Sequence, residues 1–162
     1  MAVLAAVSSM SACIIPVAPD FQDPPNQPDS VPALHTTVNT PAFNSITSLT
    51  SATATFQVNA SDPDPEATLS YQFVFDYPPN AFGMPRLGNS ASMLPVPASL
   101  SQDVTCQRVD NTQQSRTHQL TLYVTTGSFD TSNPSVFGTA TDASAVVVTD
   151  GWTIQFQMAC PQ

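Results

Sequence analysis

Three acidic side chains lie close together in a short segment between two expected strands. Asp62, Asp64 and Glu66 occupy every second position, and a proline follows each aspartate. Carboxylate oxygens are the ligands that Ca²⁺ prefers, but the ion takes about six to eight oxygens, so these side chains would supply only part of a calcium site. The alternative interpretation is a polar turn that its prolines make rigid.

Side chains suited to catalysis are scarce. The only histidines are His35 and His118, and we expect His118 to form a hydrogen bond at a strand end rather than to act as a general base. The chain has no G-x-S-x-G elbow, no H-E-x-x-H zinc motif and no evident acid and base pair. We therefore expect a protein that is not an enzyme and needs no cofactor, with calcium as the one exception. The alternative, a hydrolase with an unrecognised site, would hold His118 in a pocket near a carboxylate and a serine.

The longest connection between expected strands covers residues 78–100. Loops of this length are usually functional or disordered. Phe82, Met84 and Arg86 are of types enriched at interfaces, and Leu87 adds an apolar side chain. These four residues are the predicted binding loop, and the alternative is that part of this connection forms an edge strand packed on the core.

The composition favours strands over helices and excludes two kinds of partner. Hydrophobic residues make up 41% of the chain, which is enough for a core, whereas charged residues make up only 9% and lysine is absent. Polarity comes from Ser, Thr, Asn and Gln, which suit strands and turns better than helix faces. With three arginines and a net charge of −9, the chain cannot neutralise the phosphates of nucleic acid or bind anionic lipid headgroups by charge.

Apolar and polar residues alternate in several segments, as in half-buried strands. The clearest strands are predicted at 52–58, 69–77, 119–125 and 152–158, and weaker ones at 34–38, 45–50 and 103–109. Asp150 and Gly151 predict a hairpin turn before Trp152, which we expect to anchor the core. The sequence therefore predicts an antiparallel β-sandwich of about seven to eight strands.

The first 13 residues form an apolar run that ends Ser11-Ala12-Cys13. This run resembles the end of a bacterial lipoprotein signal peptide, in which cleavage exposes a cysteine that carries lipid. The resemblance implies removal of residues 1–12 and anchoring at the cell envelope, at the outer membrane, through a lipid on Cys13. The basic segment that should begin a signal peptide is missing, so we expect the true start codon to lie upstream. The alternative is a buried N-terminal strand with a free cysteine.

Export would explain the odd number of cysteines, because Cys13 would carry the lipid while Cys106 and Cys160 form a disulfide. Such a long loop would contribute about 4 kcal/mol of stability by the loop-entropy argument. Two unpaired buried thiols are the alternative, which suits a cytosolic protein better. Residues 13–32 are rich in proline and predict a disordered, extended tether, so that the β-sandwich domain covers residues 33–162.

The segment Val58–Phe73, with Asp62-Pro63-Asp64 before Leu69-x-Tyr71, is similar to a turn and strand of cadherin-like and other immunoglobulin-like modules of bacterial surface proteins. The whole chain resembles secreted bacterial lipoproteins with a single immunoglobulin-like domain. The resemblance implies an immunoglobulin-like sandwich that binds an envelope protein or an external ligand without catalysis. The alternative that it also implies is a calcium-dependent adhesion module.

Overall fold

The computed structural model describes residues 30–77, 85–105, 117–133 and 136–157, which form strands and turns but no helix. Within these ranges there is accordingly no helix long and apolar enough to span a membrane. The prediction of an all-β chain with about seven to eight strands is confirmed. The strands are β1 (Ala33–Thr36), β2 (Ile46–Leu49), β3 (Thr53–Ser61), β4 (Thr68–Phe75), β5 (Arg86–Pro95), β6 (Ala98–Thr105), β7 (Thr117–Thr125) and β8 (Val147–Phe156).

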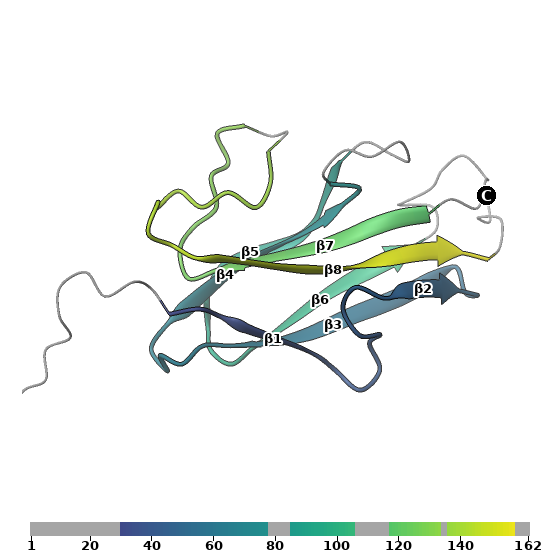
Figure 1. Ribbon diagram of the computed structural model, residues 1–162, viewed down its shortest axis with the longest axis horizontal. Helices are drawn as coiled ribbons and strands as arrows, with labels where there is room; N and C mark the ends of the chain where they lie inside the picture. Colours follow the sequence, from purple (N-terminus) through teal and green to yellow (C-terminus); the bar gives the residue numbers. More distant parts are fainter. Residues whose placement is uncertain (1–29, 78–84, 106–116, 134–135, 158–162) are drawn as a thin grey trace, which may run out of the picture.

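The strands form two sheets that face one another as the layers of a sandwich (Figure 1). One sheet has the order β1-β3-β6 and the other has the order β2-β8-β7-β4-β5. All pairs of these strands are antiparallel except β2 and β8, which run parallel, so the prediction of a purely antiparallel sandwich is wrong at this pair. After β1 in the three-stranded sheet, the chain crosses to the five-stranded sheet, where β2 pairs with β8. No hairpin joins β2 to β8, so nothing imposes antiparallel pairing on them.

Alternating apolar residues from both sheets meet in one core, as predicted. Tyr77 is an exception, because Asp76 adopts a left-handed φ of 55° and ends the alternation of β4. Tyr77 packs instead against Tyr123 and Phe137, at ring-centroid distances of 6.4 and 5.3 Å. Met158, also predicted to point inward, lies outside the described residues. The predicted inward residues that are fully buried are Phe56, Val58, Leu69, Phe73, Phe75, Leu120, Leu122, Val124, Trp152, Ile154 and Phe156.

Trp152 anchors this core, as predicted from its place in the last strand. Its side chain is only 1% exposed, and its ring centroid lies 4.9 Å from that of Phe43 and 5.0 Å from that of Phe56. The indole Nε1–H donates a hydrogen bond to the carbonyl oxygen of Pro41 at 2.9 Å. Burying an aromatic side chain of this kind contributes about 3 kcal/mol. Trp152 therefore ties the segment before β2 to both sheets.

Asp150 and Gly151, predicted to form a hairpin turn, lie instead in the middle of β8. The ladder between β7 and β8 continues through both residues without a break. The prediction was wrong because Gly151 is needed where the backbones of β7 and β8 come close together, and not for a turn with positive φ. A Cβ atom at position 151 would lie 2.4 Å from the carbonyl oxygen of Leu120 and 3.1 Å from Cα of Thr121.

Residues 86–95 form β5, so the edge-strand interpretation of the long connection holds for this part of it. Arg86 and Leu87 of the predicted binding loop open this strand, whereas Phe82 and Met84 lie outside the described residues. β6 begins at residue 98, earlier than the predicted strand at 103–109. The sequence hides β5 because an edge strand is exposed along most of its length, and its Gly, Asn and Ser residues show no alternation.

The outer face of the five-stranded sheet is partly covered by the connection between β7 and β8. The backbone N–H of Gly138 donates to Oε1 of Gln72 at 3.2 Å. Gly138 has a positive φ of 70° and sits against the ring of Tyr123, where a Cβ atom would lie 2.3 Å from Cδ1. This cover explains why outward-facing residues of β4 are buried, namely Ser70, Gln72 and Val74.

A buried polar clamp joins the two sheets between the middle of β5 and the middle of β6. Gln102 on β6 is fully buried, and its Oε1 accepts a hydrogen bond from the backbone N–H of Asn89 at 2.5 Å. Its Nε2 donates to the carbonyl of Asp103 at 2.7 Å, and Nδ2 of Asn89 donates to the carbonyl of Ser101 at 2.8 Å. β3 is the only strand that β6 pairs with among the described strands. These side-chain donors occupy β6 carbonyls that a further strand would need, and so protect the edge.

We expect Gln102→Leu to lower the free energy of unfolding by about 2 kcal/mol, because the backbone groups of Asn89 and Asp103 lose buried partners. Urea unfolding followed by the fluorescence of Trp152, the single tryptophan of the chain, measures this change. Gln57→Leu is the matched control, since Gln57 is exposed on β3, and its effect should stay within about 0.5 kcal/mol. Equal losses in the two variants would contradict the clamp.

Candidate functional site

The acidic segment predicted as part of a calcium site forms a turn between β3 and β4. Oδ1 of Asp62 accepts hydrogen bonds from the backbone N–H of Asp64 at 2.9 Å and from the hydroxyl of Ser30. Oδ1 of Asp64 accepts one from the backbone N–H of Glu66 at 2.9 Å. Such bonds from aspartate to backbone two residues later are typical of polar turns. Across the described ranges, no three His, Cys, Asp or Glu side chains gather in a way that could hold a metal ion.

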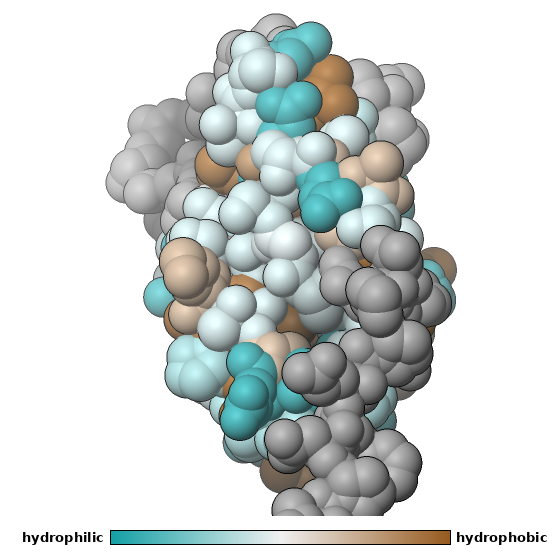
Figure 2. Space-filling view, turned by 90° about the vertical axis from the view of Figure 1, so that its left-hand side faces the viewer, coloured by the Kyte–Doolittle hydropathy of each residue, from teal (hydrophilic) through white to brown (hydrophobic). Residues whose placement is uncertain are grey.

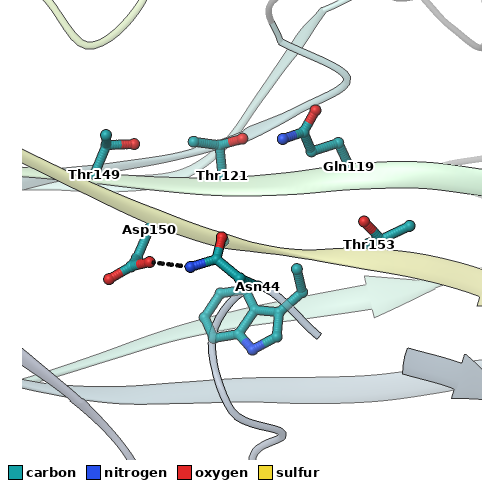
Figure 3. A pocket seen from close by; sticks show the side chains of 8 residues that line it. Asn44, Gln119, Thr121, Thr149, Asp150 and Thr153 are labelled. Carbon is teal, nitrogen blue, oxygen red and sulfur yellow. Dashed lines mark hydrogen bonds between the residues drawn. The ribbon is translucent and has the colours of Figure 1, made fainter. Parts of the chain in front are cut away.

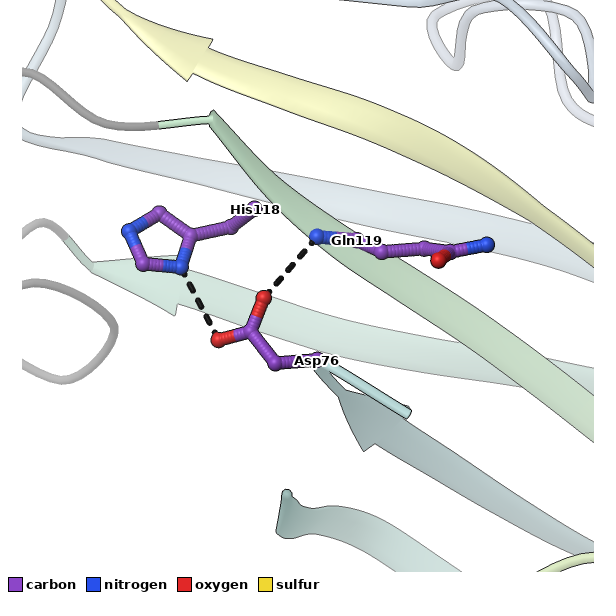
Figure 4. Close-up of polar contacts among 3 residues, drawn as sticks. All are labelled: Asp76, His118 and Gln119. Carbon is purple, nitrogen blue, oxygen red and sulfur yellow. Dashed lines mark hydrogen bonds and ion pairs between the residues drawn. The ribbon is translucent and has the colours of Figure 1, made fainter. Parts of the chain in front are cut away.

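Asp76 and His118 form a buried polar pair where β4 ends beside β7 (Figure 4). The two side chains are 4% and 2% exposed, and Oδ2 of Asp76 lies 2.9 Å from Nδ1 of His118. Oδ1 of Asp76 accepts from the backbone N–H of Gln119 at 3.1 Å, and the Asp76 N–H donates to the Gln119 carbonyl at 2.8 Å. The pair therefore fastens the end of β4 to β7. The prediction that His118 forms a hydrogen bond near a strand end agrees with this geometry.

His118 has one feature of the hydrolase alternative, a neighbouring carboxylate, but its side chain is almost completely buried. A general base must come within hydrogen-bond reach of the proton that it abstracts. His118 lines neither of the surface hollows described below. His35, the other histidine, is exposed on β1.

The first hollow lies on the outer face of the five-stranded sheet and has a volume of about 300 Å³ (Figure 3). Gly151, which has no side chain, forms its floor between β7 and the turn before β2. Asn44 donates a hydrogen bond from Nδ2 to Oδ1 of Asp150 at 3.1 Å across its margin. The polar side chains around this hollow come from three segments of the chain and are Asn44, Gln119, Thr121, Thr149, Asp150 and Thr153.

A second hollow, of about 370 Å³, lies between the outer face of β4 and β5 and the connection after β7. Serine side chains line much of it, including Ser70 and Ser90. Phe129 and Thr131 of the connection close one side. Asp130, which lies between them, accepts a hydrogen bond from the backbone N–H of Ser132, and this bond lowers the pKa of its carboxyl.

The remaining predicted site residues are outside the part of the chain that the structure describes. These are the lipid-bearing Cys13, the disulfide cysteines Cys106 and Cys160, and Phe82 and Met84 of the binding loop. Their roles stay predictions. Arg86 and Leu87 are exposed at the start of β5 and line neither hollow.

Sequence reasoning did not find the first hollow, although one signal for it exists. Gln119, Thr121 and Thr153 occupy the polar positions of the two strands whose alternation was clearest. The alternation therefore placed these side chains on the outer face. It did not show that Asn44, far away in the sequence, joins them through its bond to Asp150.

Substitutions of Asp76 test the buried pair, because the effect of losing its carboxylate can be distinguished from the effect of its left-handed φ of 55°. Asp76→Ala removes both acceptors and places a residue that tolerates this φ poorly, so we expect it to lower the free energy of unfolding by about 3 kcal/mol. Asp76→Asn keeps an acceptor and tolerates the φ, and should recover more than half of that loss. Urea unfolding of both variants measures the difference. A harmless alanine variant would contradict a structural role for the pair.

Comparisons with known proteins do not assign the chain to a family. No family model, no curated protein and no solved structure matches the chain.

Proposed function

We propose that this chain is a lipid-anchored protein of the cell envelope, at the outer membrane, whose immunoglobulin-like sandwich is a non-catalytic binding module. The observation that carries the binding role is the first hollow, where amide, hydroxyl and carboxylate groups surround the bare backbone of Gly151 on an open sheet face. A site of this kind offers hydrogen bonds to a ligand from the outside. The burial of His118 favours binding over hydrolysis.

The strand order supports the immunoglobulin-like part of the proposal. The neighbours β8-β7-β4-β5 follow the order G-F-C-C′ of variable-type immunoglobulin sheets, and β1-β3-β6 follow the order A-B-E of the opposite sheet. One feature differs, because immunoglobulin domains carry their buried tryptophan on strand C, whereas Trp152 lies on the last strand. The proposal therefore concerns architecture and not membership of a family.

The proposal of a lipid anchor rests on the sequence of the first 32 residues. The apolar run that ends Ser11-Ala12-Cys13 resembles a lipoprotein signal, and the proline-rich segment 13–32 would separate the sandwich from the bilayer. Stable anchoring takes two or more acyl chains, which a lipidated N-terminal cysteine provides. The net charge of −9 makes lipid, and not surface charge, the means of membrane attachment in this proposal.

We expect mass spectrometry to find a diacylglyceryl group on Cys13 in protein from a membrane fraction. The chain should be expressed with its upstream genomic sequence, so that a complete signal peptide is present. Cys13→Ser is the matched control and should release the protein from the membrane fraction. An unmodified Cys13 behind a retained Met1 would overturn the anchor.

A calcium-dependent adhesion module is the second candidate, because Oδ2 of Asp62 is buried and forms no hydrogen bond within the described part of the chain. A ligand that binds the native state alone must raise its melting temperature. Since Asp62 and Asp64 already bond to the backbone of their own turn, we expect equal melting temperatures in Ca²⁺ and in chelator. Calorimetry measures both, with Asp64→Asn as control. A rise in Ca²⁺ that this variant abolishes would favour the calcium-dependent module.

A further inference from the structure

We propose that the first hollow binds a neutral carbohydrate, an inference that rests on the proposed binding function and names its ligand class. The hollow lies on two central strands, β7 and β8, and not on a mobile loop. Its volume of about 300 Å³ is at the lower end of the range of small-ligand sites. A short stretch of sugar units laid along the sheet face fits a hollow of this kind better than an enclosed small molecule does.

The groups around the hollow select the chemistry of the ligand. Two amides, from Asn44 and Gln119, and the hydroxyls of Thr149 and Thr153 supply both donors and acceptors, whereas Thr121 is buried. The described residues that line the hollow include no Lys, Arg or His, so they offer an anionic ligand no ion pair, and the chain has a net charge of −9. Asp150 is the single carboxylate among these described residues, which is too few for a calcium site. A neutral ligand with many hydroxyl groups matches this set.

The polar groups are held in place before any ligand arrives. Asn44 has a left-handed φ of 58°, and its backbone N–H donates to the Gly151 carbonyl at 2.7 Å. Its side chain is fixed by the 3.1 Å bond to Asp150. The hydroxyl of Thr121 donates to the carbonyl of Tyr77 at 3.2 Å. Because these groups need little further ordering, less entropy is lost when a ligand binds.

An aromatic pair lies beside the polar groups on the same face. Tyr123 on β7 is the cross-strand partner of Thr149 on β8, which lines the hollow. The ring of Tyr123 lies 6.4 Å from that of Tyr77, and both side chains are half-buried. Burial raises the pKa of Tyr123, and Tyr77 raises it further, so the hydroxyl stays neutral. Gly138 packs against the ring of Tyr123 and Phe137 packs against that of Tyr77, so the pair borders the hollow without being part of its lining.

The face drawn in Figure 2 offers little to an apolar ligand. Teal and white residues dominate the face drawn in Figure 2. Exposed large apolar side chains, such as Val38, Ile46 and Met93, belong to separate segments. The first hollow, whose described lining combines amides, hydroxyls and one carboxylate, is therefore the feature from which we infer a ligand class.

The test is titration of the full chain with neutral hexasaccharides, namely cello-, manno-, xylo- and chitohexaose, and with anionic hexagalacturonate. Calorimetry gives affinities, and amide chemical shifts give the location. We expect saturable binding of at least one neutral sugar, with shifts at Gln119, Thr121 and Thr149, and no binding of hexagalacturonate. Gln119→Ala should weaken binding about fivefold.

Gln57→Ala is the matched control, because Gln57 is also an exposed strand glutamine but lies on the opposite sheet. It should leave the affinity unchanged. The inference is overturned if none of the neutral sugars binds, if hexagalacturonate binds equally well, or if both glutamine variants behave alike. If Cys13 carries lipid and none of these sugars binds, the ligand class is refuted and the proposed anchor stands. If Cys13 is unmodified and a neutral sugar binds, the proposed anchor is refuted and the ligand class stands.

Discussion

The closure of the sandwich depends on one backbone contact, between the turn before β2 and the middle of β8. The N–H of Asn44 donates to the Gly151 carbonyl at 2.7 Å, and the N–H of Thr153 donates to the Ser45 carbonyl at 3.0 Å. These bonds start the parallel pairing and carry the chain from one sheet to the other. The same residue must be glycine because of its other neighbour, β7, since a Cβ atom at 151 would lie 2.4 Å from the Leu120 carbonyl oxygen. The missing side chain also leaves the hollow on the sheet face, so one residue serves both the fold and the candidate site.

Alternation predicted the central strands because those strands have one face in the core. Phe56, Leu122 and Ile154 are fully buried at positions that the pattern assigned to the inside. The pattern failed where a different constraint acted on the backbone. Asp150 and Gly151 match a hairpin turn in composition, but their glycine is needed for a close approach within a continuous strand. The exposed strand β5 has no buried face to mark it, so no single-sequence pattern could reveal it.

The polar contacts were less predictable than the core, because they join residues that are distant in the sequence. The acidic turn was predicted correctly as a connection, since its bonds span only two residues, from Asp62 to Asp64. The pair of Asp76 and His118 spans 42 residues, and the bond from Asn44 to Asp150 spans 106. Local periodicity places each of these side chains on a strand but not beside its partner. Strand order decides which of them meet.

With so few charges, the proposed binding module would recognise a ligand mainly through neutral groups. Charged residues make up 9% of the sequence, and Asp150, the single charged side chain among the described residues that line the first hollow, already accepts a hydrogen bond from Asn44. Amide and hydroxyl hydrogen bonds are screened by salt far less than ion pairs are, so binding through such groups would vary little with ionic strength. The negative field of the chain repels anions and leaves neutral molecules unaffected. The composition that disfavours nucleic acid as a partner thus also narrows the proposed ligand class, because it disfavours anionic sugars and not neutral ones.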